Sequence, residues 1–99
     1  MTTAYDYPTE DELQKIRDWP VGDNLGLLEF VRSIWWLPEW GWDSADGKYN
    51  ISTGGWSGNE EIIGAMQANY IFWGTCWRVS RAGGHFEFQV PELTAQGAD

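Results

Sequence analysis

Tryptophan constrains this fold more than any other feature, because eight of the 99 residues carry an indole side chain. A chain of this length forms one domain with a modest core, and indole rings let such a core bury much apolar area with few residues. Hydrophobic residues make up 42% and aromatic residues 16%, which excludes a disordered chain. Eight indoles are many for so small an interior. We therefore expect about two or three of them to lie partly exposed around a groove, while the others pack in the core.

The N-terminal part of the sequence predicts two helices. Thr9 and Glu12 have the spacing of a capping box, and Trp19-Pro20 ends the helix that they open, because the residue before a proline avoids the α region. Asp23 or Asn24 begins a second helix, and Leu37-Pro38 stops it. Apolar residues recur at helical spacing in this second segment, at Leu27, Leu28, Val31, Ile34 and Trp35.

A hairpin and a third helix follow. Trp40-Gly41-Trp42 alternates like a short strand, Asp46-Gly47 is a strong hairpin-turn signal, and residues 48–53 are the returning strand. A glycine-rich loop then leads into a helix, where Ser57 and Glu60 again have capping-box spacing. The apolar face of that helix is expected to contain Ile62, Ile63, Met66, Tyr70 and Trp73.

The C-terminal part predicts a second hairpin. Residues 71–79 fit a helix or a strand, and we favour a strand over 72–80 because β-branched and aromatic residues dominate there. Residues 81–84 form a turn, and residues 85–90 alternate as a strand. The order α-α-β-β-α-β-β predicts an α+β fold, in which a small antiparallel sheet of two hairpins packs with about three helices. We expect a single domain over residues 1–91 and a flexible tail over 92–99.

The charge and the cysteine content exclude several classes of function. The net charge is −9, from 15 acidic and six basic residues, so direct nucleic-acid binding is not expected. Such a surface either maintains solubility or mimics nucleic acid toward a basic partner. The single cysteine, Cys76, allows no internal disulfide and no cysteine-based zinc site, and it is expected to be a small buried side chain. We find no signal-peptide pattern and no apolar run long enough to span a bilayer, so a cytoplasmic location and no membrane contact are expected.

The glycine-rich loop is the most unusual stretch. A turn of this kind at a helix start presents free N–H groups and the positive end of the helix dipole, which suits a phosphate or carboxylate. The candidate ligand-binding residues here are Thr53, Trp56, Ser57, Gly58 and Asn59, with Trp56 placed to stack on a ring. The alternative is a plain strand-to-helix turn. It is favoured by Glu60 and Glu61, which would repel an anion, and by the absence of a P-loop lysine.

Two further groups of residues are candidates for the same groove. Trp40 and Trp42 would share one strand face and form an aromatic wall, or else belong to the core or an oligomer interface. Arg78, Arg81 and His85 flank the last hairpin and would supply the charged end of an anion-binding groove if that hairpin lies beside the glycine loop. The alternative for the two arginines is pairing with the acidic surface.

The case for catalysis or metal binding is weak. His85 is the single histidine, and no Ser-His-Asp or Cys-His arrangement is recognisable. His85 and Glu87 share a strand face, but two ligands are a weak metal signal. We therefore expect no enzyme activity, no catalytic residues, no cofactor and no metal.

Residues 52–61 (STGGWSGNEE), with Trp40-Gly41-Trp42 before them and Arg81-Ala82-Gly83-Gly84-His85 after them, resemble small bacteriophage proteins of about this length. The resemblance spans the chain from Tyr7-Pro8 to Pro91. It carries no catalytic residues over, because no activity is assigned to that group. It implies a phage origin and hence a location in the host cytoplasm. Small acidic phage proteins of this kind are often accessory factors, and some counter host defence by binding a defence enzyme or by sequestering its nucleotide signal.

Two functions follow as hypotheses. The first is an anti-defence binding protein that sequesters a small anionic, ring-bearing ligand such as a nucleotide signal. The second is an acidic inhibitor that occupies a basic site on a host enzyme, as a nucleic-acid mimic does. A homo-oligomer fits either, because a small protein with spare tryptophans can bury them symmetrically.

Overall fold

The computed structural model describes residues 7–91, and its first two helices begin where the sequence predicts. Helix α1 (Glu10–Arg17) opens with a complete capping box, because Thr9 Oγ1 accepts from Glu12 N–H at 3.0 Å while Thr9 N–H donates to Glu12 Oε1 at 2.9 Å. Helix α2 (Asn24–Ile34) is capped by the Asp23 carboxylate, which accepts from Gly26 N–H at 3.2 Å. Both predicted helix starts are confirmed.

The two predicted hairpins join into one antiparallel sheet. Strands β1 (Trp42–Ala45) and β2 (Lys48–Ser52) form the first, and strands β3 (Trp77–Arg81) and β4 (His85–Gln89) form the second. Asp46 and Gly47 both adopt positive φ, as a two-residue turn of this kind requires. Strand β2 pairs with β4, which gives the order β1-β2-β4-β3. The predicted α+β class and element order are confirmed.

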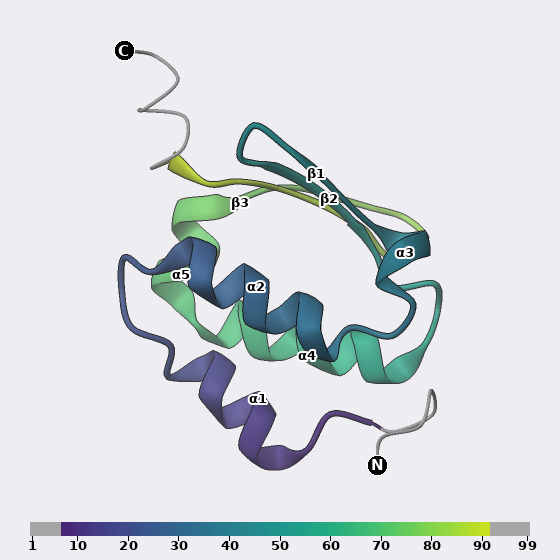
Figure 1. Cartoon of the computed structure of the whole chain (residues 1–99), viewed down its shortest axis with the longest axis horizontal. Coiled ribbons are helices and arrows are strands. Elements are labelled where there is room, and N and C mark those ends of the chain that lie inside the picture. Colours follow the sequence, from purple (N-terminus) through teal and green to yellow (C-terminus); the bar gives the residue numbers. More distant parts are fainter. Residues whose placement is uncertain (1–6, 92–99) are drawn as a thin grey trace.

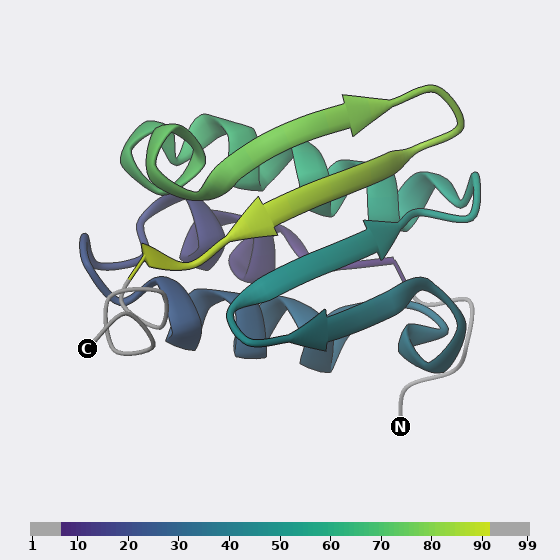
Figure 2. The same cartoon turned by 90° about the horizontal axis from the view of Figure 1, so that it is seen from above.

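The helices cover one face of this sheet. Helix α2 lies beneath the β1 edge of the sheet and helix α4 (Ser57–Ala68) beneath the β3 edge, while α1 lies on the side of these helices away from the sheet (Figures 1 and 2). The paired residues Tyr49–Phe88 and Ile51–Phe86 point toward the helices, and polar residues alternate with them on the open face. The fully buried core contains Ile16, Leu27, Leu28, Val31, Ile51, Ile62, Met66, Cys76, Phe88 and Val90.

The predicted strand at Trp40-Gly41-Trp42 is wrong in its first two residues. Pro38–Gly41 forms the short helix α3, and β1 begins only at Trp42. Pro38 stands at the start of this helix, where its fixed φ is already helical, and Leu37 before it takes the left-handed conformation with φ 58°. Trp40 and Trp42 therefore do not share a strand face: Trp40 is 67% exposed, whereas Trp42 packs against the core.

The predicted strand over 72–80 is also wrong at its start. Tyr70–Cys76 forms helix α5, and β3 begins at Trp77. Asn69 caps α5, since its side-chain oxygen accepts from Phe72 N–H, and Phe72 and Cys76 bury the same helix face four residues apart. This packing overrides the β propensity of the segment. Tyr70 and Trp73 belong to α5, so the prediction that they lie on the apolar face of α4 is wrong, and Tyr70 is 82% exposed.

No helix within residues 7–91 has the length and hydropathy needed to cross a bilayer. The tail predicted at 92–99 lies outside the described residues.

Candidate functional site

One end of the sheet gathers most of the candidate residues. Strand β2 ends there in the glycine-rich loop, and the β3–β4 turn lies against that loop, because Thr53 N–H donates to Gly84 C=O at 3.0 Å. A Cβ at Gly84 would collide with Thr53 Oγ1, so glycine is needed for this close approach. The hairpin therefore does lie beside the glycine loop, as one of the binding hypotheses required.

Asn59 holds this end together. The side chain is 1% exposed, and its Oδ1 accepts from Trp36 N–H at 2.9 Å. Its Nδ2 donates to the backbone carbonyls of Trp36 and Thr53, at 3.1 and 3.2 Å. Asn59 thus joins the start of α4 to the end of β2 and to the segment after α2. Its amide groups are fully engaged inside the protein.

Trp56 lies in a row of aromatic rings. Its centroid is 5.2 Å from that of Tyr7 and 5.1 Å from that of Trp36. Gly58 lies directly under the Trp56 ring, where a Cβ would overlap three ring atoms. These contacts fix the position of the Trp56 ring between Tyr7 and Trp36, and the ring leaves no room for a side chain at position 58.

The capping box predicted at Ser57 and Glu60 is wrong. The N-cap of α4 is Trp56, which makes no side-chain cap, and Ser57 is already the first helical residue. The Ser57 hydroxyl instead makes a 2.7 Å hydrogen bond with the Tyr7 hydroxyl. The side chain therefore fixes the N-terminal segment over Trp56, and Tyr7 is a contributor that the sequence reasoning missed.

A pocket of about 210 Å³ opens beside this row, lined by Trp36, Leu37, Trp40, Thr53 and Gly54. Trp40 is 67% and Leu37 46% exposed, so its rim is apolar and accessible. Leu37 holds its positive φ although a leucine there is strained, and such strain is concentrated at functional sites. Leu37 was missed because the sequence marks it only as a helix stop before Pro38.

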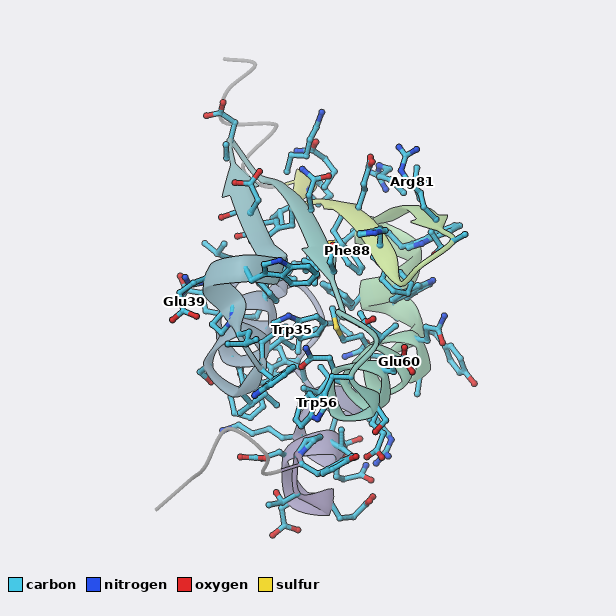
Figure 3. All side chains as sticks on the ribbon, turned by 90° about the vertical axis from the view of Figure 1, so that its right-hand side faces the viewer. Trp35, Glu39, Trp56, Glu60, Arg81 and Phe88 are labelled. Atoms are coloured by element: carbon cyan, nitrogen blue, oxygen red, sulfur yellow. The ribbon has the colours of Figure 1, made fainter. Side chains whose placement is uncertain are left out.

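Among residues 7–91, none of the side chains that line this pocket is charged. Arg81 donates two hydrogen bonds to the Glu87 carboxylate, and Arg78 donates to the carbonyls of Thr75 and Trp77. Figure 3 views the molecule from this end. Arg81 lies beside the strands of the sheet, whereas Trp56 lies on the other side of the molecule, close to α1. The two arginines proposed for the groove are thus directed elsewhere.

His85 and Trp42 are not among the residues that line the pocket. His85 Nδ1 is hydrogen-bonded to Ser52 Oγ across the β2–β4 pair, a contact that the strand register predicts only once β2 is known to pair with β4. Trp42 makes edge contacts with Trp35 and Tyr49 in the core. Within residues 7–91 no set of three or more His, Cys, Asp or Glu side chains is grouped as metal ligands.

Two buried indole N–H groups, those of Trp35 and Trp36, lack a hydrogen-bond acceptor among the described residues. A buried donor left unpaired costs about 1–3 kcal/mol. Trp36 also lines the pocket, so the protein keeps this destabilising, unpaired donor in a residue of the candidate site. Such a cost is typical of residues that are retained for function and not for stability alone.

No known protein family matches the sequence, and no curated protein or solved structure matches the chain. The resemblance to bacteriophage proteins therefore stays a prediction.

Proposed function

We propose that the chain is an acidic protein-binding module that docks on a basic site of a partner protein. The docking surface would be the rim and lining of the pocket, namely Trp36, Leu37, Trp40, Thr53 and Gly54, which we call the Trp40 surface. The observation that carries the proposal is the 67% exposure of Trp40 beside the exposed Leu37. Exposed tryptophans at the centre of an apolar patch are the side chains that most often dominate protein interfaces.

The size of the pocket favours a side chain over a whole nucleotide. Sites for drug-sized ligands have volumes of about 300–1,000 Å³. The pocket has about 210 Å³, which suits one inserted side chain better than a base, sugar and phosphate together.

Charge favours the same choice. Four of the six basic side chains are already engaged: Arg81 with Glu87, Arg17 with Glu10, Lys15 over aromatic rings, and Arg78 with carbonyls. An anionic ligand at the pocket would meet an uncharged wall on a protein of net charge −9. A basic partner is instead attracted to it, with an association rate that falls as salt rises.

Affinity capture with matched variants tests this proposal. Trp40→Ala removes the central contact, and Tyr70→Ala removes an aromatic ring that is 82% exposed in a different helix. A specific partner should be retained by the wild type and by Tyr70→Ala, and lost by Trp40→Ala and at high salt. A set of captured proteins that does not differ between the two variants would contradict the proposal.

The sequestering hypothesis is the second candidate, and the lining of the pocket by the indoles of Trp36 and Trp40 favours it. A ring-bearing ligand would stack on these indoles. Arg32, four residues before Trp36, would then have to supply the positive charge. In either candidate the protein acts by occupying a site, and we expect no catalysis. Counter-defence by a phage protein is the setting that the resemblance suggests for both.

A further inference from the structure

We infer that the pocket between Trp36 and Trp40 accepts the guanidinium group of an arginine side chain on the partner protein. The inference rests on the proposed docking function and names the chemistry of the inserted group. An arginine side chain is long, planar and cationic, and it stacks on aromatic faces better than an ammonium does.

The walls of the pocket have the composition that such a group needs. Two of the five lining residues are tryptophans, and indole is the best aromatic partner for a cation. The ring of Trp40 lies against Gly54, where a Cβ would be 3.2 Å from Cζ3, and Gly54 has φ +68°. Glycine at this position therefore lets the Trp40 ring approach the loop and form one wall.

The same chain already uses this interaction elsewhere. Lys15 Nζ lies 4.7 Å from the ring centroid of Phe30 and 5.7 Å from that of Trp19. Both distances are below the limit of about 6 Å within which an aromatic ring attracts a cation. A cation of the protein itself already occupies these two rings, whereas no basic residue of the described part of the chain lines the pocket.

Charge around the pocket completes the argument. Glu39 precedes Trp40 in α3 and is exposed at the outer edge of this end of the molecule (Figure 3). Its carboxylate adds negative charge to this end of the molecule, which attracts an approaching guanidinium. Arg32 is the basic residue nearest to Trp36 in the sequence, on α2, and it would oppose the incoming charge.

Nuclear magnetic resonance with a short peptide tests the inference. The probe is acetyl-Gly-Arg-Gly-amide, and the controls are the same peptide with citrulline, norleucine or lysine in the middle. Citrulline keeps the shape of arginine without its charge, and norleucine keeps only an apolar chain. Indole N–H resonances of the labelled full chain report on Trp36 and Trp40, after assignment with Trp36→Phe and Trp40→Phe.

The arginine peptide should shift the Trp36 and Trp40 resonances and bind about tenfold more tightly than the citrulline peptide. Glu39→Gln should weaken arginine binding about two- to threefold, Arg32→Gln should strengthen it by a similar factor, and the matched control Asp18→Asn, in the loop after α1, should leave it unchanged. Wild-type dispersion of the remaining resonances shows that each variant is folded.

Equal binding of the citrulline or norleucine peptide would overturn the inference, as would no shift of either indole. Tighter binding of the lysine peptide would also overturn it, because the site would then recognise a point charge. The proposed function fails differently: if arginine binds but captured proteins do not depend on Trp40, the pocket chemistry holds and docking does not.

Discussion

Replacing Asn59 with alanine should destabilise the protein by about 3 kcal/mol. The Asn59 side chain makes three hydrogen bonds to backbone groups of Trp36 and Thr53, and it is 1% exposed. Each buried hydrogen bond contributes about 1 kcal/mol net, and a partner left unpaired costs more than the mean. A domain of this size has only about 5–15 kcal/mol of total stability, so the loss is large.

The assay is urea unfolding followed by tryptophan fluorescence. For a slope of about 1–2 kcal/mol per molar urea, the unfolding midpoint should fall by about 2 M. Asn69→Ala is the matched control, because Asn69 also bridges distant backbone segments, from Phe72 N–H to the Ile16 carbonyl. We expect both variants to lose stability, but only Asn59→Ala to disturb the Trp36 indole resonance.

A loss below about 0.5 kcal/mol in Asn59→Ala would refute the reasoning. The amide would then be solvated, and Asn59 would return to the list of groups available to a ligand.

Three further outcomes are expected. Gly58→Ala should displace the Trp56 ring, which changes the near-ultraviolet circular dichroism and lowers the stability by about 1 kcal/mol. Gly64 lies at an open, exposed site in the same helix, so Gly64→Ala should raise the stability by about 0.5–1 kcal/mol in the same urea assay. Arg81→Ala should change the stability by less than about 1 kcal/mol, because its ion pair with Glu87 is exposed. The variant should still capture the partner, and loss of capture would show that Arg81 takes part in binding. Burial, with smaller contributions from Glu29 and Cys76, raises the pKa of Tyr49 above 10.0. The folded protein therefore favours the neutral Tyr49 phenol, which stabilises it below pH 10.0, and this stabilisation is lost as the pH rises further. Tyr49→Phe should lose less stability than the wild type in alkaline unfolding curves.

Local chemistry made much of the fold predictable. The Thr9 capping box, the Asp23 helix start and the Asp46-Gly47 turn each depend on residues that are adjacent in sequence, and all three are confirmed. The sheet order β1-β2-β4-β3 could not be obtained in this way, because pairing of β2 with β4 depends on contacts between distant segments.

Two of the failures have the same cause, which is tertiary packing. Phe72 has a strand preference but buries with Cys76 on one face of a helix. Ser57 has the spacing of a cap but bonds to Tyr7, which is 50 residues away. Of the predicted site residues, Thr53 and Trp40 line the pocket. The role of Asn59 as an internal clamp could not be predicted, because it depends on a segment 23 residues away.

Native mass spectrometry of the protein, isolated gently from the cells in which it acts, tests the central claim most directly. It measures subunit number and bound mass together. The docking proposal predicts a bound protein in the wild type that persists in Tyr70→Ala and is absent in Trp40→Ala. A bound small molecule in place of a protein, retained by Trp40→Ala, would contradict the account.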